Sequence, residues 1–346
     1  IKNDNDLLPI TGTEKLNIGV ISLGETSKTV FQDILDYYGN FKYYSLVKDF
    51  TLKERDSLIK MIKQHDLLIV SLHNTSSLPS KNYGISSQII SLIDTLSSIK
   101  KVVLNVFGYP YIMNVFNGRA NPASILISNQ DRVESQWASA QVIFGASQSQ
   151  GFLPVSISDR FPLKKSINIE KIRLGFALPE EKGIDSENLS LIDSIALMGI
   201  KEEAYPGCQI LIAQDSDVIY YKSFGNVSYT DTTSVNNKMV YDLASITKVA
   251  STTLAIMKLY ENNKLELDDK LSKYLKYLRK SNKRNITIRQ VMSHQARLKP
   301  WIPFYKEVIK NGIIDSNYFR KSYSNIFSLR STTQLTVSAR RESFNG

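Results

Sequence analysis

The sequence predicts a parallel, doubly wound α/β sheet domain that is followed by an α+β domain. Two observations carry this prediction. Strand-like and helix-like stretches alternate through residues 1–150, whereas a helix, a hairpin and a second helix follow one another after residue 182. Regular alternation of strands and helices implies a parallel sheet with helices on both faces. At 346 residues the chain is long enough for two domains, each with its own core.

Five short runs rich in β-branched residues are predicted as the strands of the first domain. Apolar residues dominate these runs, as expected for strands that are covered on both faces. The runs are LNIGVIS (16–22), YYSL (43–46), DLLIVSL (66–72), KVVLNVF (101–107) and ASILIS (123–128).

Three amphipathic stretches between these runs are predicted as helices. The first, TLKERDSLIKMIKQ, begins at Thr51, and Glu54 three residues later completes a capping box. Its apolar residues recur at helical spacing, which places them on one face. SSQIISLIDTLSSI (86–99) and ESQWASAQVIFG (134–145) behave similarly.

A connecting segment is predicted over residues 161–182, where charged residues surround Pro162 and Pro179. This segment separates the alternating pattern before it from a different order of elements after it. The predicted organisation is a sheet domain over 1–160, a linker over 161–182 and a second domain over 183–346.

The second domain begins with a helix that opens at Asp185 or Ser186 and ends before Pro206. Two alternating runs around Asp-Ser-Asp in CQILIAQDSDVIYYKSFG (208–225) are typical of a hairpin. An apolar helix then begins at Ser245. Helix, hairpin and helix in this order indicate an α+β fold.

The composition, with 42% hydrophobic and 22% charged residues, is that of a soluble globular protein. The net charge of +10 comes from isolated lysines and arginines, so the sequence predicts no nucleic-acid partner. Cys208 is the single cysteine, which excludes an internal disulfide and a thiolate metal site. No apolar run is long enough to span a membrane, and residues 1–10 lack signal-peptide character.

Several common sites are absent from the sequence. No Gly-x-Gly-x-x-Gly follows the first strand and no Gly-Lys pair occurs, so neither a dinucleotide site nor a phosphate loop is predicted. No His-Glu-x-x-His helix supports zinc hydrolysis, and we expect no cofactor and no metal. His73 is predicted to lie in a solvated polar loop, and His294 to be a hydrogen-bonded structural residue.

The pattern Ser-x-x-Lys, which can pair a nucleophile with a base, occurs five times in the chain. The match at Ser245 differs from the others because it combines a helix start with an apolar helix, in YDLASITKVAST (241–252). That helix is apolar nearly all round, so we expect it to be central to its domain and Lys248 to be drawn into the interior. The five serines are Ser45, Ser57, Ser97, Ser98 and Ser245.

Ser245 and Lys248 are three residues apart, a spacing that places both side chains on one helix face. A serine hydroxyl becomes a good nucleophile when a neighbouring base takes its proton. Burial disfavours a charged ammonium and would leave Lys248 as a neutral amine that can act as this base. The alternative is that Ser245 caps the helix while Lys248 extends into solvent. The two residues alone leave both interpretations open.

The sequence around this pair resembles the serine β-lactamase-like family, which includes class C β-lactamases, penicillin-binding D-alanyl-D-alanine peptidases and related esterases. Three segments carry the resemblance: PGCQILIAQDSDVIYYKSFG, VYDLASITKVASTTLAIMKLYENNKLELDDKLSKYL and ITIRQVMSHQARL. The resemblance implies that Ser245 is the acylated nucleophile and Lys248 its activating base. The implied reaction is acyl transfer to serine followed by hydrolysis.

Two departures from the family pattern stand out. Arg297 occupies a position where the family usually has glycine. The family also needs a Tyr-x-Asn element, for which Tyr323, Ser324 and Asn325 have the right order, and a later Lys-Thr-Gly strand, which does not follow. The resemblance therefore implies an incomplete α+β β-lactamase-like domain, and we expect the isolated chain to be inactive.

The first domain resembles the C-terminal α/β sandwich domain of glycoside hydrolase family 3 in IKNDNDLLPI (1–10), VVLNVFGYPYIMNVF (102–116) and IFGASQSQGFLPVSIS (143–158). The resemblance implies a fragment of a β-N-acetylglucosaminidase-like hydrolase whose catalytic barrel is absent, fused to the serine acyl hydrolase. It implies a carbohydrate or cell-wall peptide substrate and a periplasmic or extracellular location. The alternative is a non-catalytic module that binds peptidoglycan or a partner.

Overall fold

The computed structural model describes residues 1–299, Pro303 and five two-residue strands between residues 309 and 337. Two compact units make up the chain, Ile1–Met239 and Val240–Gly346. The triplet from Tyr323 to Asn325 lies outside the described residues.

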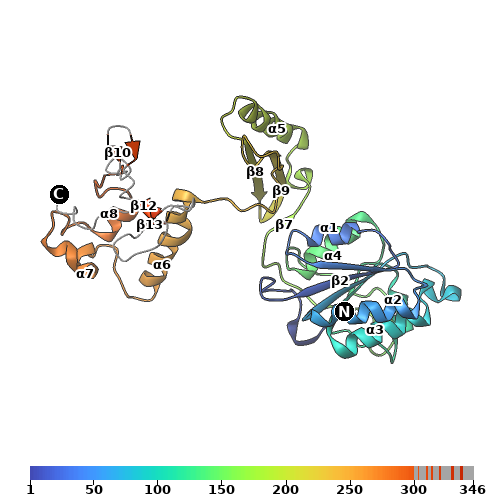
Figure 1. Cartoon of the computed structure of the whole chain (residues 1–346). Helices are drawn as coiled ribbons and strands as arrows, with labels where there is room; N and C mark the ends of the chain where they lie inside the picture. The colour runs from blue at the N-terminus through green and yellow to red at the C-terminus, as the bar shows by residue number, and fades with distance from the viewer. Residues whose placement is uncertain are drawn as a thin grey trace. The chain divides into compact units, whose positions relative to one another are not determined.

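A six-stranded sheet forms the centre of the first unit (Figure 1). Its strand order is β1-β6-β5-β4-β2-β3, and every neighbouring pair is parallel except β1 with β6. The order reverses between β2 and β4, and the loops that leave such a reversal point are where open α/β sheets bind ligands. The strands are β1 (Lys2–Asn3), β2 (Ile18–Leu23), β3 (Lys42–Leu46), β4 (Leu67–Leu72), β5 (Lys101–Val106) and β6 (Ser124–Ile127).

Helices cover both faces of this sheet. Leu58 of α2 and Ile93 of α3 belong to the buried cluster on one face, and Phe31 of α1 and Ile143 of α4 belong to the cluster on the other. Figure 1 shows these two pairs of helices on opposite sides of the strands. The helices are α1 (Val30–Leu35), α2 (Leu52–Met61), α3 (Ser87–Ile99) and α4 (Val133–Ile143).

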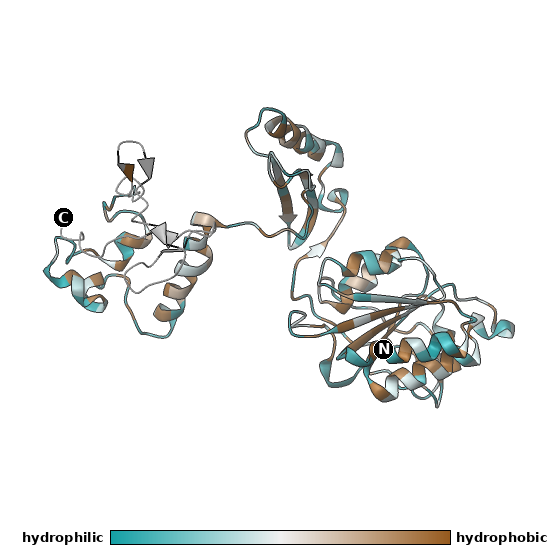
Figure 2. Ribbon diagram, in the orientation of Figure 1, coloured by the Kyte–Doolittle hydropathy of each residue, from teal (hydrophilic) through white to brown (hydrophobic). Residues whose placement is uncertain are grey.

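The predicted sheet domain is confirmed in its main elements. Every residue of β2 and β4 is buried, and Figure 2 shows brown, hydrophobic colours on strands in the middle of the sheet. The predicted capping box is present: Thr51 Oγ1 accepts from the Glu54 N–H at 3.3 Å, and the Thr51 N–H donates to Glu54 Oε2 at 2.7 Å. The fold class, a parallel doubly wound sheet followed by an α+β segment, is therefore as predicted.

Helix α1 is one element that the sequence patterns did not predict. It has only six residues, too few for a helical period to repeat twice. A local signal was present nonetheless, because Thr29 and Gln32 form a second capping box at its start.

The rest of the first unit holds a helix and a three-stranded sheet of order β7-β9-β8. Strand β7 lies inside the segment predicted as a linker and pairs in parallel with β9. Asp185 caps α5, and Asp215 and Ser216 turn the hairpin with positive φ angles of 49° and 67°, as type I′ turns require. The elements are β7 (Gly175–Phe176), α5 (Ser186–Lys201), β8 (Gly207–Gln214) and β9 (Asp217–Gly225). The domain boundaries at 160 and 183 stay predictions.

The second unit contains short elements. Its helices are α6 (Leu254–Glu261), α7 (Leu271–Tyr274) and α8 (Ile288–Met292), and its strands are β10 (Ile309–Lys310), β11 (Ile313–Ile314), β12 (Phe319–Arg320), β13 (Leu329–Arg330) and β14 (Thr336–Val337). Single-turn or irregular helices across the chain are η1 (Asp4–Asp6), η2 (Ile62–Gln64), η3 (Pro79–Gly84), η4 (Pro110–Phe116), η5 (Pro179–Lys182), η6 (Ala244–Ile246), η7 (Lys248–Thr253) and η8 (Lys276–Lys280). Among the residues described, none of the helices has the length and apolar character needed to cross a membrane.

Candidate functional site

Ser245 and Lys248 are in contact in the second unit. Ser245 lies in the 3-10 helix η6, and Lys248 opens the π-helical stretch η7. Lys248 Nζ donates a hydrogen bond to Ser245 Oγ at 2.9 Å. Neither helix start has a side-chain capping bond, so Ser245 does not act as a cap. The contact that a nucleophile and its base need is present, and the chemical role of the pair is taken up as a proposal below.

This contact separates Ser245 from the other Ser-x-x-Lys matches. Lys48 Nζ donates instead to the carbonyl of Asn74, and Lys100 Nζ donates to the carbonyl of Lys63 at 2.8 Å. The hydroxyls of the two serines that end α3 donate to carbonyls of their own helix. Within residues 1–299, no Ser–Lys side-chain hydrogen bond forms at Ser45, Ser57, Ser97 or Ser98.

The helix that follows Ser245 is exposed, so the predicted burial is wrong. Val249 is 67% exposed and Met257 is 59% exposed, and both Ser245 and Lys248 are exposed. The apolar pattern identifies a helix, but α7 and α8 have only four and five residues and cover one side of it. Lys248 therefore does not lie in the apolar interior that the sequence predicted.

A cleft of about 560 Å³ lies beside Lys248, and His294 and Arg297 line it. His294 is exposed and makes no side-chain hydrogen bond within residues 1–299, and its predicted structural role stays a prediction. Arg297 has a φ of 55°, in the left-handed region that glycine adopts without steric cost. This conformation explains why glycine suits the position in the family that the sequence resembles.

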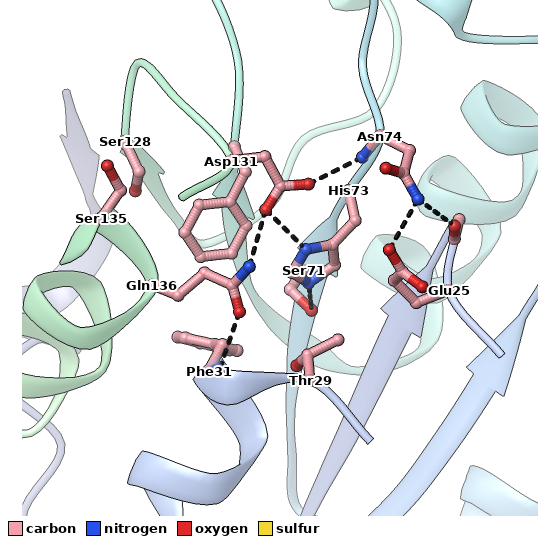
Figure 3. Close-up of polar contacts among 12 residues, drawn as sticks. Glu25, Thr29, Phe31, Ser71, His73, Asn74, Ser128, Asp131, Ser135 and Gln136 are labelled. Carbon is pink, nitrogen blue, oxygen red and sulfur yellow. Dashed lines mark hydrogen bonds and ion pairs between the residues drawn. The ribbon is translucent and has the colours of Figure 1, made fainter. Parts of the chain in front are cut away.

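A second polar cluster lies at the carboxyl edge of the sheet in the first unit (Figure 3). His73 follows β4 directly and is buried. Its Nδ1 lies 3.1 Å from Asp131 Oδ1 and its Nε2 lies 3.0 Å from Ser71 Oγ. The ring stacks on Phe107 with a centroid distance of 4.7 Å. The prediction that His73 lies in a solvated loop is therefore wrong.

The carboxylate of Asp131 links the loop after β4 to helix α4. Besides the contact with His73, Gln136 Nε2 donates to Oδ1 at 2.9 Å and the Asn74 N–H donates to Oδ2 at 2.8 Å. Although burial alone raises the pKa of this carboxyl, these hydrogen bonds hold it below its ordinary value. Asn74 Nδ2 in turn donates to Glu25 Oε1 at 2.6 Å, so the loops after β2 and β4 are tied together.

This cluster at the carboxyl edge was missed because its partners are distant in sequence. His73 and Asp131 are 58 residues apart, and no local sequence pattern predicts their contact. The position of His73 directly after a strand at the reversal point was the available signal. In the part of the chain that the structure describes, no group of three or more His, Cys, Asp or Glu side chains is placed to hold a metal ion.

One family model matches part of the chain. The family model described as Beta-lactamase matches residues 193–308. A putative D-alanyl-D-alanine carboxypeptidase of Escherichia coli O157:H7 is 32% identical over 104 residues, which are 28% of this chain and 24% of that protein. A protein of the same description from Salmonella enteritidis is 29% identical over 109 residues, or 30% of this chain and 25% of that one. The chain thus spans about a quarter of the length of these relatives.

Solved structures with similarity to the chain include two hydrolases. One is a glycoside hydrolase family 3 β-N-acetylglucosaminidase from Paenibacillus sp. str. FPU-7, with 12% identity, a TM-score of 0.37, and coverage of 46% of this chain and 30% of that one. The other is a β-glucosidase from Listeria innocua, with 14% identity, a TM-score of 0.32, and coverage of 43% and 24%. The family match gives the chain a β-lactamase-like segment over residues 193–308.

Proposed function

We propose that Ser245 is the nucleophile and Lys248 the base of a serine acyl hydrolase. The observation that carries this proposal is the 2.9 Å contact between Lys248 Nζ and Ser245 Oγ, inside the segment that matches the β-lactamase family. A nucleophile and a base within hydrogen-bond reach are the geometric requirement for this chemistry.

The reaction that the pair would perform has two halves. Lys248, as a neutral amine, takes the hydroxyl proton of Ser245 while Oγ bonds to the acyl carbon of the substrate. Collapse of the tetrahedral species breaks the bond to the leaving amine or alcohol, which receives the proton from Lys248. Water then attacks the acyl-serine ester by the same route, and release of the acid restores the Ser245 hydroxyl.

The substrate proposed is a cell-wall peptide, a β-lactam or a simple ester, acted on in the periplasm or outside the cell. The carboxypeptidase description of the relatives in Escherichia coli and Salmonella supports this choice. We further propose a parent protein in which residues 1–160 form the second domain of a family 3 glycosidase acting on cell-wall glycans. A linker over 161–182 would join this domain to the acyl hydrolase over 183–346.

Covalent labelling tests the role of Ser245. The chain is incubated with a fluorophosphonate and with a fluorescent penicillin, and intact mass and peptide mapping locate the adduct. We expect one adduct on Ser245 that is lost in Ser245→Ala. Ser251→Ala, which changes another exposed serine close by in η7, should keep it. Lys248→Ala should slow labelling by about 10²–10⁴-fold, the usual contribution of a general base.

Turnover is expected to be slow in the chain as it stands. The exposed pair lacks the water-excluded, preorganised surroundings that supply the largest part of transition-state stabilisation. Rapid hydrolysis of nitrocefin by this chain would contradict that expectation. Equal labelling of Ser245→Ala and the unmodified chain would disprove the role of Ser245.

A binding module is the second candidate, and one observation favours it. Ile246, Val249, Leu254 and Met257 expose apolar side chains along the same helix, and such surfaces commonly mark interaction sites. This candidate predicts that no acylating probe labels the chain, whereas the hydrolase predicts labelling at Ser245.

A further inference from the structure

A cleft of about 620 Å³ opens in the first unit, on the face of α4. Its lining comes from α4 and the segment after that helix, from the chain around β7, from the start of β9 and from Val30 of α1. Its volume lies in the range of about 300–1,000 Å³ that is typical of small-ligand sites. None of the lining residues belongs to the second unit, so this cleft is independent of Ser245.

Two aromatic side chains form one wall of the cleft. Trp137 of α4 is half-buried and lies against Phe176 of β7, with 6.3 Å between ring centroids and 56° between the planes. The Phe176 N–H donates to Gln141 Oε1 at 2.7 Å, and Tyr37 packs on the Phe176 ring at 4.5 Å. Phe176 is therefore fixed, and the indole N–H of Trp137 has no acceptor within residues 1–299.

The cleft is also lined by polar groups that are nearly balanced in charge. Asp217 accepts from Lys171 Nζ at 2.6 Å and lies 2.7 Å from Lys182 Nζ. Glu134 and Glu181 also line the cleft, and both are exposed and without an ion pair in the described part of the chain. Three carboxylates and two ammonium groups give the lining one net negative charge. The lining therefore offers hydrogen-bond acceptors and donors but no positive potential that would attract an anion.

We propose that this cleft binds a short, neutral pyranose oligosaccharide, with one sugar ring against the face of Trp137. A pyranose ring has an apolar C–H face, which suits an indole, and a hydroxyl edge that both donates and accepts. The carboxylates of Glu134 and Glu181 accept from such hydroxyls. The Trp137 N–H donates to them, as does the Gln148 amide through the N–H that is not already given to Asn168 Oδ1. A phosphate-bearing ligand would be repelled by three carboxylates. A purely apolar ligand would remove water from the polar side chains without replacing their hydrogen bonds.

Tryptophan fluorescence tests the proposal in the full chain. With Trp301→Phe, Trp137 is the only tryptophan left, so its emission reports on this cleft. Titrations use cellotriose and chitotriose, which differ in their acetamido groups. We expect a saturable change with a dissociation constant of about 1 mM for at least one of the two sugars. Glu134→Gln combined with Glu181→Gln should weaken binding about tenfold, whereas Glu14→Gln, an exposed carboxylate outside the cleft, should leave it unchanged.

Saturation-transfer NMR with Trp137→Ala provides a readout that does not need the indole. Loss of sugar signals in a variant that melts like the unmodified chain supports the proposal. If that variant does not fold, Gln148→Ala, at an exposed position, takes its place and should weaken binding. The proposal is overturned if neither sugar changes the emission of Trp137. It is also overturned if binding survives both the folded Trp137 variant and the double glutamine variant.

Discussion

Asp131→Asn tests how strongly the polar cluster at the carboxyl edge stabilises the first unit. The Asp131 side chain is 20% exposed and accepts from His73, Gln136 and the backbone of Asn74. Asparagine keeps one acceptor oxygen but presents an NH₂ group in place of the other, so at least one donor would face another donor. A hydrogen bond to a charged group contributes about 1.5–3 kcal/mol. We therefore expect the free energy of unfolding to fall by about 2–3 kcal/mol at neutral pH.

The loss of unfolding free energy caused by Asp131→Asn should become smaller as the pH falls. Because hydrogen bonds hold the folded-state pKa of Asp131 below its ordinary value, the unfolded state binds more protons once the pH falls to about 4. The contribution of this carboxylate is fully present above its unfolded pKa of about 3.9 and is lost as the pH falls through the folded value. The difference between the unmodified chain and Asp131→Asn should shrink in that window.

Urea unfolding followed by Trp137 fluorescence, in a Trp301→Phe background, measures this difference in the unit that holds Asp131. Glu134→Gln is the matched control, because Glu134 is exposed on the same helix and makes no ion pair among the described residues. The control should stay within about 0.5 kcal/mol. A loss below about 0.5 kcal/mol for Asp131→Asn, or one that is unchanged down to about pH 3, would refute the reasoning.

Two further predictions concern the fold of the first unit. Gly19→Ala would place a Cβ 2.7 Å from Cδ2 of the buried His65 ring, and we expect a loss of about 1–3 kcal/mol in the same urea assay; an unchanged midpoint would show that His65 can move aside. Thr51→Ala removes the hydroxyl that completes the capping box with Glu54 and should cost about 1 kcal/mol. Ser57→Ala, on the exposed side of the same helix, is its control, and equal effects of the two changes would argue against capping.

Local patterns predicted those parts of the fold that local forces decide. The five parallel strands follow from runs of apolar and β-branched residues, and α2 follows from a spacing of apolar residues and a capping box. Strand β1 has only two residues and is held by pairing with β6, more than a hundred residues away along the chain. Such an element has no pattern of its own, because its pairing partner alone defines it.

The candidate sites also differ in whether local sequence or distant contacts determine them. The Ser245–Lys248 contact could be predicted, since three-residue spacing on a helix makes such a contact possible, although the same spacing at Ser97 does not produce one. The burial of His73 could not, because it depends on Asp131 and Phe107, which arrive from other strands and loops. The expected burial of Lys248 was wrong for the same reason: periodicity shows that a helix is apolar but not what covers it.

The helix that follows Ser245 exposes apolar side chains, and this exposure bears on the proposed chemistry of Ser245 and Lys248. Full burial of apolar side chains such as Val249, Leu254 and Met257 would contribute about 1.5–3 kcal/mol each. A segment or partner that covers this helix would therefore gain that free energy on binding. The same covering would remove water from Lys248 and favour its neutral, basic form. Acyl transfer by Ser245 and covering of the helix are therefore coupled in this proposal. A segment or partner that protects Val249 and Met257 from solvent should speed labelling of Ser245, and protection that leaves the labelling rate unchanged would separate the two.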